Sequence, residues 1–300
     1  IVSICFLSQG LGVAIAKYNT ENTLQLAFSE FFPETNIEAQ EKILRQLAGS
    51  YQLTECDTYL LLESRDYRHL SIEAPVVEDH EMKAALRWKV TDLVDFSVED
   101  ACLDFYRLPD AKHTNSKKML AVIASAMTSI KPKVALCQQV KLTIKVIDIQ
   151  ETALRNLAVL LPENKRGIAI LHLLPQSGCI IIQKAGELYL SRKLNIGFDD
   201  LNLETNAASN ESSDLALEVQ RSLDYVESYY GLPPISSLAV IPTPAYCQNL
   251  LDQLNENLSI SARIMDISTI LDTDILLADN TQAYCAGVIG ATLRHELETE

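Results

Sequence analysis

The sequence predicts an α/β fold of two similar lobes, with a smaller unit inserted into the first lobe. Short apolar runs typical of strands alternate with segments in which apolar residues recur every three or four positions, as in amphipathic helices. A group of three strands opens the chain and recurs from about residue 168, which indicates an internal duplication. The length of 300 residues also exceeds the usual size of a single domain.

The first lobe is expected to comprise residues 1–64 and 148–166. A helix at Ile37–Ala48, ending at Gly49, and a buried central strand at Thr58–Leu62 follow the opening strands. A second helix is predicted at Gln150–Leu161, after the insertion. The opening strands, joined by a glycine turn at Gly10–Gly12, are Val2–Leu7, Val13–Tyr18 and Leu24–Phe28.

The inserted unit is expected to span residues 65–147 and to follow the order βαββαβ. The polar stretch Pro109–Lys118 between two of its strands is typical of a hairpin tip. The predicted elements of this unit are, in order, Tyr67–Ile72, Glu78–Val94, Cys102–Leu108, Met119–Ser125, Ser129–Gln139 and Thr143–Ile147.

The second lobe is expected to comprise residues 167–300. A solvated or mobile loop is predicted at Asn202–Ser213, where polar residues dominate. A final helix at about Thr281–His295 carries small residues on one face, which favours close helix–sheet contact and, alternatively, leaves room for an adenine ring. The other elements are strands at Ile168–Leu174, Cys179–Gln183, Leu188–Leu194, Leu238–Ile241 and Ile260–Ile264, and helices at Asp214–Tyr230 and Ala245–Leu254.

The composition narrows the classes of function. A net charge of −15 disfavours nucleic acid or an anionic membrane surface as the principal partner. Seven widely spaced cysteines without a C-x-x-C pair suit a reducing compartment, and the five histidines show no metal-binding spacing. Average usage predicts about 20 glycines in a chain of this length. The chain has only 10, which is unfavourable for an enzyme that must bring its backbone close to phosphates.

Four stretches of the chain carry a family resemblance: EMKAALRWKVTDLVDFSVEDACLDFYRL (81–108), KVIDIQETALRNL (145–157), GELYLSRKLNIGFDDL (186–201) and EVQRSLDYVESYYG (218–231). In this order they resemble segments of the PilM family of type IV pilus assembly proteins. Within that family they are most similar to MshI, of mannose-sensitive haemagglutinin (MSHA) pilus biogenesis. The resemblance implies an actin-like (ribonuclease H-like) two-lobed fold with an inserted PilM/FtsA-type subdomain.

The nucleotide-binding motifs of the actin-like fold are degenerate in this sequence. Relatives that bind nucleotide have Asp-x-Gly at the end of the first strand of each lobe, and a Gly-Gly turn against the adenosine. The carboxylates and glycines of these motifs are replaced here at Cys5, Leu7, His172, Leu174, Pro242 and Pro244. Because thiol and imidazole do not replace hard oxygen ligands for Mg²⁺ and proline lacks an N–H, we expect a pseudo-ATPase with no catalytic residues, bound cofactor or metal.

The resemblance implies a non-catalytic scaffold in the cytoplasm, held at the inner membrane of a Gram-negative bacterium only through its partners. Its expected partner is the cytoplasmic tail of a bitopic PilN-like inner-membrane protein (MshJ in the MSHA system), and the assembly ATPase is a further candidate. The tail is expected between the first lobe and the inserted unit, near Tyr67, Arg87, Trp88 and Phe96. For Trp88, half-buried packing between helix and sheet competes with a role as a partner anchor.

Two other functions remain open at this stage. A nucleotide switch, in which ATP closes the cleft between the lobes, has support from the Ser8–Gly10 turn and the small residues of the last helix. The chain could also be the actin-like cytoplasmic part of a GspL-like type II secretion protein. A membrane span soon after residue 300 would favour that alternative.

Overall fold

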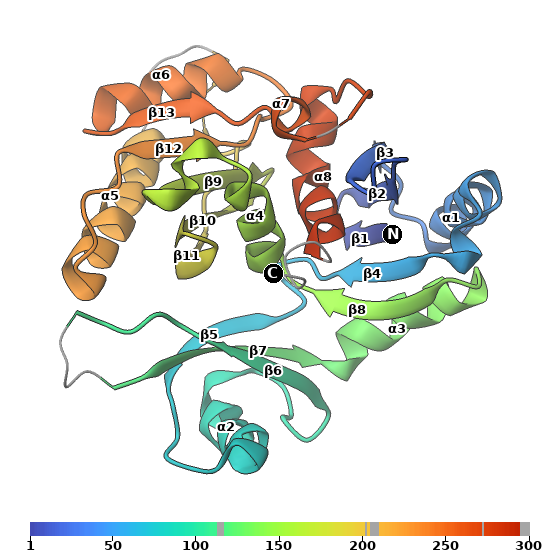
Figure 1. The fold of residues 1–300 in the computed structure, drawn as a ribbon, viewed down its shortest axis with the longest axis horizontal. Helices are drawn as coiled ribbons and strands as arrows, with labels where there is room; N and C mark the ends of the chain where they lie inside the picture. Colours follow the sequence, from blue (N-terminus) through green and yellow to red (C-terminus); the bar gives the residue numbers. More distant parts are fainter. Residues whose placement is uncertain (113–116, 202, 205–209, 272, 295–300) are drawn as a thin grey trace.

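The computed structural model describes residues 1–112, 117–201, 203–204, 210–271 and 273–294. Two five-stranded sheets with the same topology form the two lobes, in the orders β3-β2-β1-β4-β8 and β11-β10-β9-β12-β13 (Figure 1). In each sheet the first three strands are antiparallel and the last two are added in parallel, which confirms the predicted duplication. The strands are β1 (Val2–Leu7), β2 (Gly10–Tyr18), β3 (Leu24–Phe32), β4 (Asp57–Leu61), β8 (Thr143–Asp148), β9 (Ile168–Leu174), β10 (Ser177–Lys184), β11 (Glu187–Leu194), β12 (Ser237–Val240) and β13 (Ser261–Ile264).

Helices cover both faces of each sheet, because successive side chains of the buried strands point to opposite sides. In β1, Ile4 packs toward α1 and α3, whereas Cys5 packs toward α4 and α8, which lie between the two sheets. Helices α5 and α6 cover the outer face of the second sheet. The helices are α1 (Ile37–Tyr51), α3 (Met127–Gln139), α4 (Gln150–Val159), α5 (Asn210–Tyr230), α6 (Cys247–Asn257), α7 (Ile267–Ile270) and α8 (Asp279–Thr292).

Two glycine assignments from the sequence are wrong. Gly10 and Gly12 belong to β2, so the first turn of the chain is Ser8–Gln9. Gly49 lies inside α1, where it has open space around it, and the helix continues to Tyr51. The residue that ends α1 is Gln52, which adopts the left-handed conformation at φ 58° and donates its backbone N–H to Ala48.

The inserted unit is a three-stranded sheet, β5-β7-β6, whose face away from the two lobes is covered by α2 (Figure 1). Its elements are β5 (Arg68–Glu73), α2 (Met82–Val90), β6 (Ala101–Arg107) and β7 (Met119–Ala126). The elements follow the predicted order βαββαβ. The last two, α3 and β8, belong to the first lobe, because β8 pairs with β4 and α3 packs into the first-lobe core. The compact unit expected over residues 65–147 therefore ends at β7.

The last helix, α8, packs on the first sheet and against α4, although the sequence assigns it to the second lobe. A Cβ atom on Gly290 would lie 2.1 Å from the carbonyl oxygen of Ala153, and one on Gly287 would lie 2.3 Å from Oε1 of Gln150. The small residues thus permit a close contact, as predicted. The main neighbour is the helix α4, whereas the sequence predicted a sheet. This contact fills the space that an adenine ring would need at the two glycines.

Part of the predicted loop Asn202–Ser213 is helical, since α5 begins at Asn210, and residues 202 and 205–209 lie outside the described residues. Across the ranges described above, no helix combines the length and the apolar character needed to cross a membrane.

Candidate functional site

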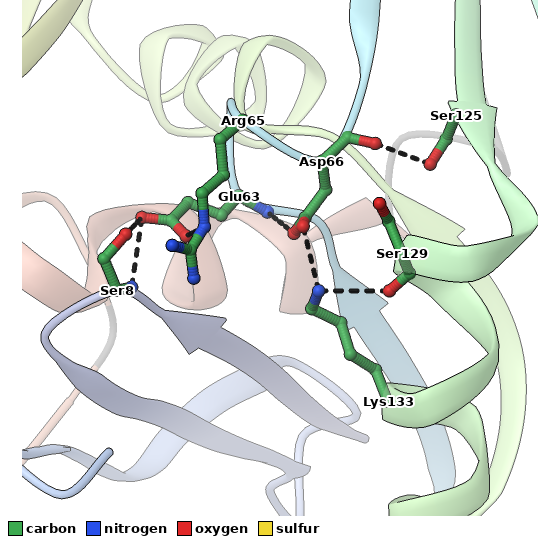
Figure 2. Close-up of polar contacts among 7 residues, drawn as sticks. All are labelled: Ser8, Glu63, Arg65, Asp66, Ser125, Ser129 and Lys133. Carbon is green, nitrogen blue, oxygen red and sulfur yellow. Dashed lines mark hydrogen bonds and ion pairs between the residues drawn. The ribbon is translucent and has the colours of Figure 1, made fainter. Parts of the chain in front are cut away.

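The first turn, between β1 and β2, is bound by a carboxylate from the chain itself. The backbone N–H and the hydroxyl of Ser8 both donate to Oε1 of Glu63, at 3.1 and 2.6 Å (Figure 2). Oε2 of Glu63 forms an ion pair with Nε of Arg65 at 2.5 Å. Both donors of Ser8, which directly follows the degenerate Asp-x-Gly positions Cys5 and Leu7, are therefore in use.

Glu63 lies in the connection from β4 to the inserted unit, and a second buried carboxylate fixes this connection (Figure 2). Asp66 accepts the N–H of Glu63 at 3.1 Å and the Nζ of Lys133 from α3 at 2.9 Å. The hydroxyl of Ser125, in β7, donates to the backbone carbonyl of Asp66 at 2.6 Å. Polar contacts thus tie the connection to the first turn, to α3 and to the inserted sheet.

The first degenerate position, Cys5, lies beneath this turn and is buried. Burial raises the pKa of its thiol well above the ordinary value, and the nearby carboxylates of Glu63 and Asp66 raise it further. The thiol is therefore neutral at physiological pH. A neutral, enclosed thiol cannot serve as a ligand for a hard metal ion.

The second turn, after β9, is closed by α8 and by a segment of its own lobe. His172 is buried, and its Nε2 lies 2.7 Å from the carbonyl oxygen of Ala283 in α8. The carbonyl groups of Leu174 and Pro175 accept hydrogen bonds from the backbone of Phe198 and Asp199, at 3.0 and 2.9 Å. This turn consequently presents bonded carbonyls and a proline in place of free N–H groups.

The third turn carries two prolines on either side of a buried threonine. Pro242 and Thr243 are buried, and the hydroxyl of Thr243 donates to the carbonyl of Ala245 at 2.8 Å. Pro244 borders a cavity of about 480 Å³ that is lined mainly by residues 198–201 and 203–204, three of which are acidic. Neither proline offers an N–H group.

The residues at these three turns do not fit Mg²⁺ and a nucleotide. The Ser8 donors hold a carboxylate, His172 is bonded to α8, and the third turn is blocked by prolines. The described residues also contain no group of three or more His, Cys, Asp or Glu side chains that could hold a metal ion.

A polar cavity of about 330 Å³ lies between the lobes, bordered by Tyr67, Glu151 and His172. The hydroxyl of Tyr67 donates to Oε2 of Glu151 at 2.5 Å, and the N–H of Gln150 donates to the same hydroxyl at 3.3 Å. Burial, together with the neighbouring Glu151, raises the pKa of Tyr67 well above its ordinary value. Tyr67 thus anchors the start of the inserted unit to α4.

A larger groove of about 1070 Å³ lies where the inserted unit meets the two lobes. It is bordered by β6 (Asp104–Arg107), by the end of β8 and start of α4 (Ile147–Thr152), and by the β10–β11 turn (Gly186–Tyr189). Both β6 and β8 are edge strands of their sheets. The side chain of Ile147 is 40% exposed here, beside an ion pair of 3.1 Å between the buried Asp148 and Arg294.

The inserted unit also reaches the second lobe beyond this groove. The backbone N–H of Lys112, after β6, donates to the carbonyl of Tyr229 at the end of α5, at 3.0 Å. The Lys112 side chain packs on Gly231, where an added Cβ would lie 2.6 Å from Cδ of the lysine. This contact, which we call the latch, holds the inserted unit against the second lobe.

Comparison with known proteins identifies the family. The family model described as type IV pilus assembly protein PilM matches residues 35–258, about three quarters of the chain. The chain belongs to the PilM family. No curated protein sequence matches this PilM-family protein significantly.

Solved structures confirm the actin-like fold of this PilM-family protein. A PilM–PilN type IV pilus biogenesis complex aligns with 98% of this chain and 97% of its own, at a TM-score of 0.77 and 15% identity. A Bacteroides thetaiotaomicron protein with an actin-like ATPase fold aligns at 0.52 and 11% identity, over 88% and 90% of the two chains. The cytoplasmic domain of EpsL, from the type II secretion system of Vibrio cholerae, aligns at 0.48 and 15% identity, over 87% and 96%.

The four predicted partner-binding residues do not form one site in the structure, and none of them lines the groove. Tyr67 borders the cavity between the lobes. Arg87 donates to the carbonyls of Val98 and Ala101, so its side chain fixes the segment that leads into β6. Trp88 is 83% exposed, which excludes half-buried packing for this side chain, and Phe96 is partly buried.

Two features of the site went unpredicted. Glu63 belongs to no recognisable motif in the sequence, and no spacing links it to Ser8, 55 residues earlier. The latch joins Lys112 to Tyr229 through backbone atoms, which carry no sequence signal at all.

Proposed function

We propose that this PilM-family protein is a non-catalytic scaffold of type IV pilus assembly that captures the cytoplasmic tail of a PilN-like inner-membrane protein. The observation that carries the proposal is the groove between the inserted unit and the two lobes. A solved PilM–PilN type IV pilus biogenesis complex has the same fold over nearly the whole chain.

The groove suits an extended peptide. Edge strands present backbone N–H and C=O groups that an added strand can pair with, and both β6 and β8 border the groove. Apolar side chains beside them, including Ile147, Leu188 and Tyr189, supply contacts for alternate residues of such a strand. A tail bound here would contact the inserted unit and both lobes at once.

The contacts at the three turns support the absence of ATPase activity. Because Glu63 uses both donors of Ser8 and His172 is bonded to α8, nucleotide binding would require these buried contacts to break. We therefore propose a pseudo-ATPase whose actin-like lobes serve as a frame for the groove.

The finer identity follows the sequence resemblance. We propose that the protein is an MshI-type member that acts in MSHA pilus biogenesis, with MshJ as its PilN-like partner and the assembly ATPase as a further candidate partner. It would reside in the cytoplasm and reach the inner membrane through its partner's tail. The net charge of −15 gives no electrostatic attraction to nucleic acid or anionic lipid.

Isothermal titration calorimetry with a synthetic peptide of the PilN-like protein's cytoplasmic tail tests the main proposal. We expect saturable one-to-one binding, absent for a scrambled peptide of the same composition. Binding of both peptides, or of neither, would contradict tail capture in this groove.

Two other functions predict different results. A nucleotide switch requires magnesium-dependent ATP binding in the micromolar range, which the same calorimeter would detect and which we expect not to observe. A GspL-like secretion protein requires a membrane span encoded after residue 300, which the full gene sequence would reveal. The groove favours the PilN-like tail, because the two edge strands that border it suit an extended peptide.

A further inference from the structure

We propose that Glu63 is a built-in ligand: its carboxylate occupies, from within the chain, an anion-binding site formed by the Ser8 N–H, the Ser8 hydroxyl and the Arg65 guanidinium. The site takes small oxyanions, and the protein supplies its own. This inference does not depend on tail capture.

The geometry is that of a bound ligand. One carboxylate oxygen accepts from two donors of a single turn residue, at 3.1 and 2.6 Å, and the other faces Nε of Arg65 at 2.5 Å. Glu63 is 5% exposed, so its charge depends on these donors for stabilisation. A turn N–H, a hydroxyl and a guanidinium are also the groups that proteins use to hold phosphates and carboxylates.

The position of the donors supports the same conclusion. Ser8 directly follows β1 and begins the first turn of the lobe, where its two donors meet the Glu63 carboxylate (Figure 2). In place of a ligand from solution, the turn receives a side chain from the connection that leads into the inserted unit. The donors are therefore satisfied permanently.

The bound carboxylate also positions the inserted unit. The N–H of Asp66 donates to the carbonyl of Glu63 at 2.8 Å, and Asp66 in turn binds Lys133 of α3. The connection between β4 and β5 is therefore held at the Ser8 turn through Glu63 and at α3 through Asp66 (Figure 2). Loss of the Glu63 carboxylate would release the first of these attachments.

Chemical rescue tests the proposal. Glu63→Ala removes the carboxylate and exposes the donors of Ser8 and Arg65, so we expect the melting temperature to fall by about 4 °C or more. Sodium formate or inorganic phosphate, titrated against sodium chloride at constant ionic strength, should restore it saturably. Glu21→Ala, at an exposed glutamate, is the matched control and should show no formate-specific or phosphate-specific change.

The double variant Glu63→Ala/Arg65→Ala should lose most of the rescue, because only the Ser8 donors remain. Equal shifts of Glu63→Ala and Glu21→Ala by formate and by phosphate would overturn the proposal. If Glu63→Ala does not fold, a double-mutant cycle of Ser8→Ala and Glu63→Gln replaces it. Coupling between the two substitutions supports the site, and additive effects on the melting temperature would overturn it.

Discussion

Nε2 of His172 donates a hydrogen bond of 2.7 Å to the carbonyl oxygen of Ala283, which joins β9 of the second lobe to α8 on the first sheet. The carbonyl can only accept, so Nε2 must carry the hydrogen. Burial lowers the pKa of His172 below its ordinary value of 6.5, while the hydrogen bond acts in the opposite direction. Nucleotide-binding relatives have the aspartate of their second Asp-x-Gly motif at this position. Here the position carries a histidine that connects the two lobes.

Acid should weaken this connection. Because the pKa of His172 is lower in the folded chain, the unfolded chain takes up a proton first as the pH falls below 6.5, so stability is lost in that direction. For this one group the loss in free energy of unfolding is at most about 1.4 kcal/mol per pH unit. Urea denaturation at several pH values measures it.

His172→Gln is the informative variant, because an amide can donate to Ala283 without titrating. We expect this variant to lose less stability between pH 6.5 and 5 than the wild type. His80→Gln, at an exposed histidine, should leave the slope unchanged. Equal slopes for the wild type and His172→Gln would show that another group controls the acid response.

The groove gives a second prediction. Ile147→Glu places a charge where an added strand would bury an apolar contact, so the affinity for the tail peptide should fall at least about tenfold, or roughly 1.4 kcal/mol. Because Ile147 is 40% exposed on an edge strand, the free energy of unfolding should change by less than about 0.5 kcal/mol. Calorimetry and urea denaturation provide the two measurements.

Leu217→Glu is the matched control, since Leu217 is 46% exposed on α5 and does not line the groove. Its tail affinity should equal that of the wild type. Equal weakening by both substitutions would point to a general charge effect and away from the groove.

The latch gives a third prediction. Gly231 has φ +67°, and Gly231→Ala adds both a strained backbone and a Cβ that meets the Lys112 side chain. We expect the amide hydrogen of Lys112, which is bonded to Tyr229, to exchange at least about tenfold faster. Hydrogen exchange followed by NMR or mass spectrometry reports this change.

Gly186→Ala provides the comparison, because Gly186 also has a positive φ, +80°, but its added Cβ would meet no atom closer than 3.8 Å. Both variants carry similar backbone strain, and only one disturbs the latch. Faster exchange of Lys112 in both variants would mean that the strain acts globally.

Trp88 gives the fourth prediction. Since its side chain is 83% exposed, Trp88→Ala should change the free energy of unfolding by less than about 0.5 kcal/mol. Because Trp88 does not line the groove, we expect tail affinity within about twofold of the wild type. A larger loss of affinity would support the sequence-based hypothesis that Trp88 anchors the partner.

Most of the elements could be predicted because each depends on its own residues. The strand at Ile168–Leu174 matches β9 at both ends, and α3 begins two residues before the predicted Ser129. The alternation of buried side chains along the central strands and the three-to-four spacing in the helices are local properties. Only the pairing of these elements required more information.

The assignment of elements to lobes shows this limit. The periodicity of residues 143–147 indicates a strand but does not reveal its partner. In the structure this strand, β8, pairs with β4 of the first lobe and not with β7 of the inserted unit. Likewise, the small residues of α8 indicate a close contact without identifying α4 as the neighbour. Pairing depends on which surfaces remain unburied after the whole chain has folded.

The sequence alone determined the duplicated α/β fold, the inserted unit and the loss of the carboxylates and glycines from the three turns, because these are properties of residue types in order along the chain. Only the tertiary structure decided what replaced them. Glu63 meets Ser8 across 55 residues, and Lys112 meets Tyr229 across 117, because packing of the lobes brings their polar atoms within hydrogen-bonding distance. Distances of this kind depend on the burial of many side chains at once, which no local pattern encodes.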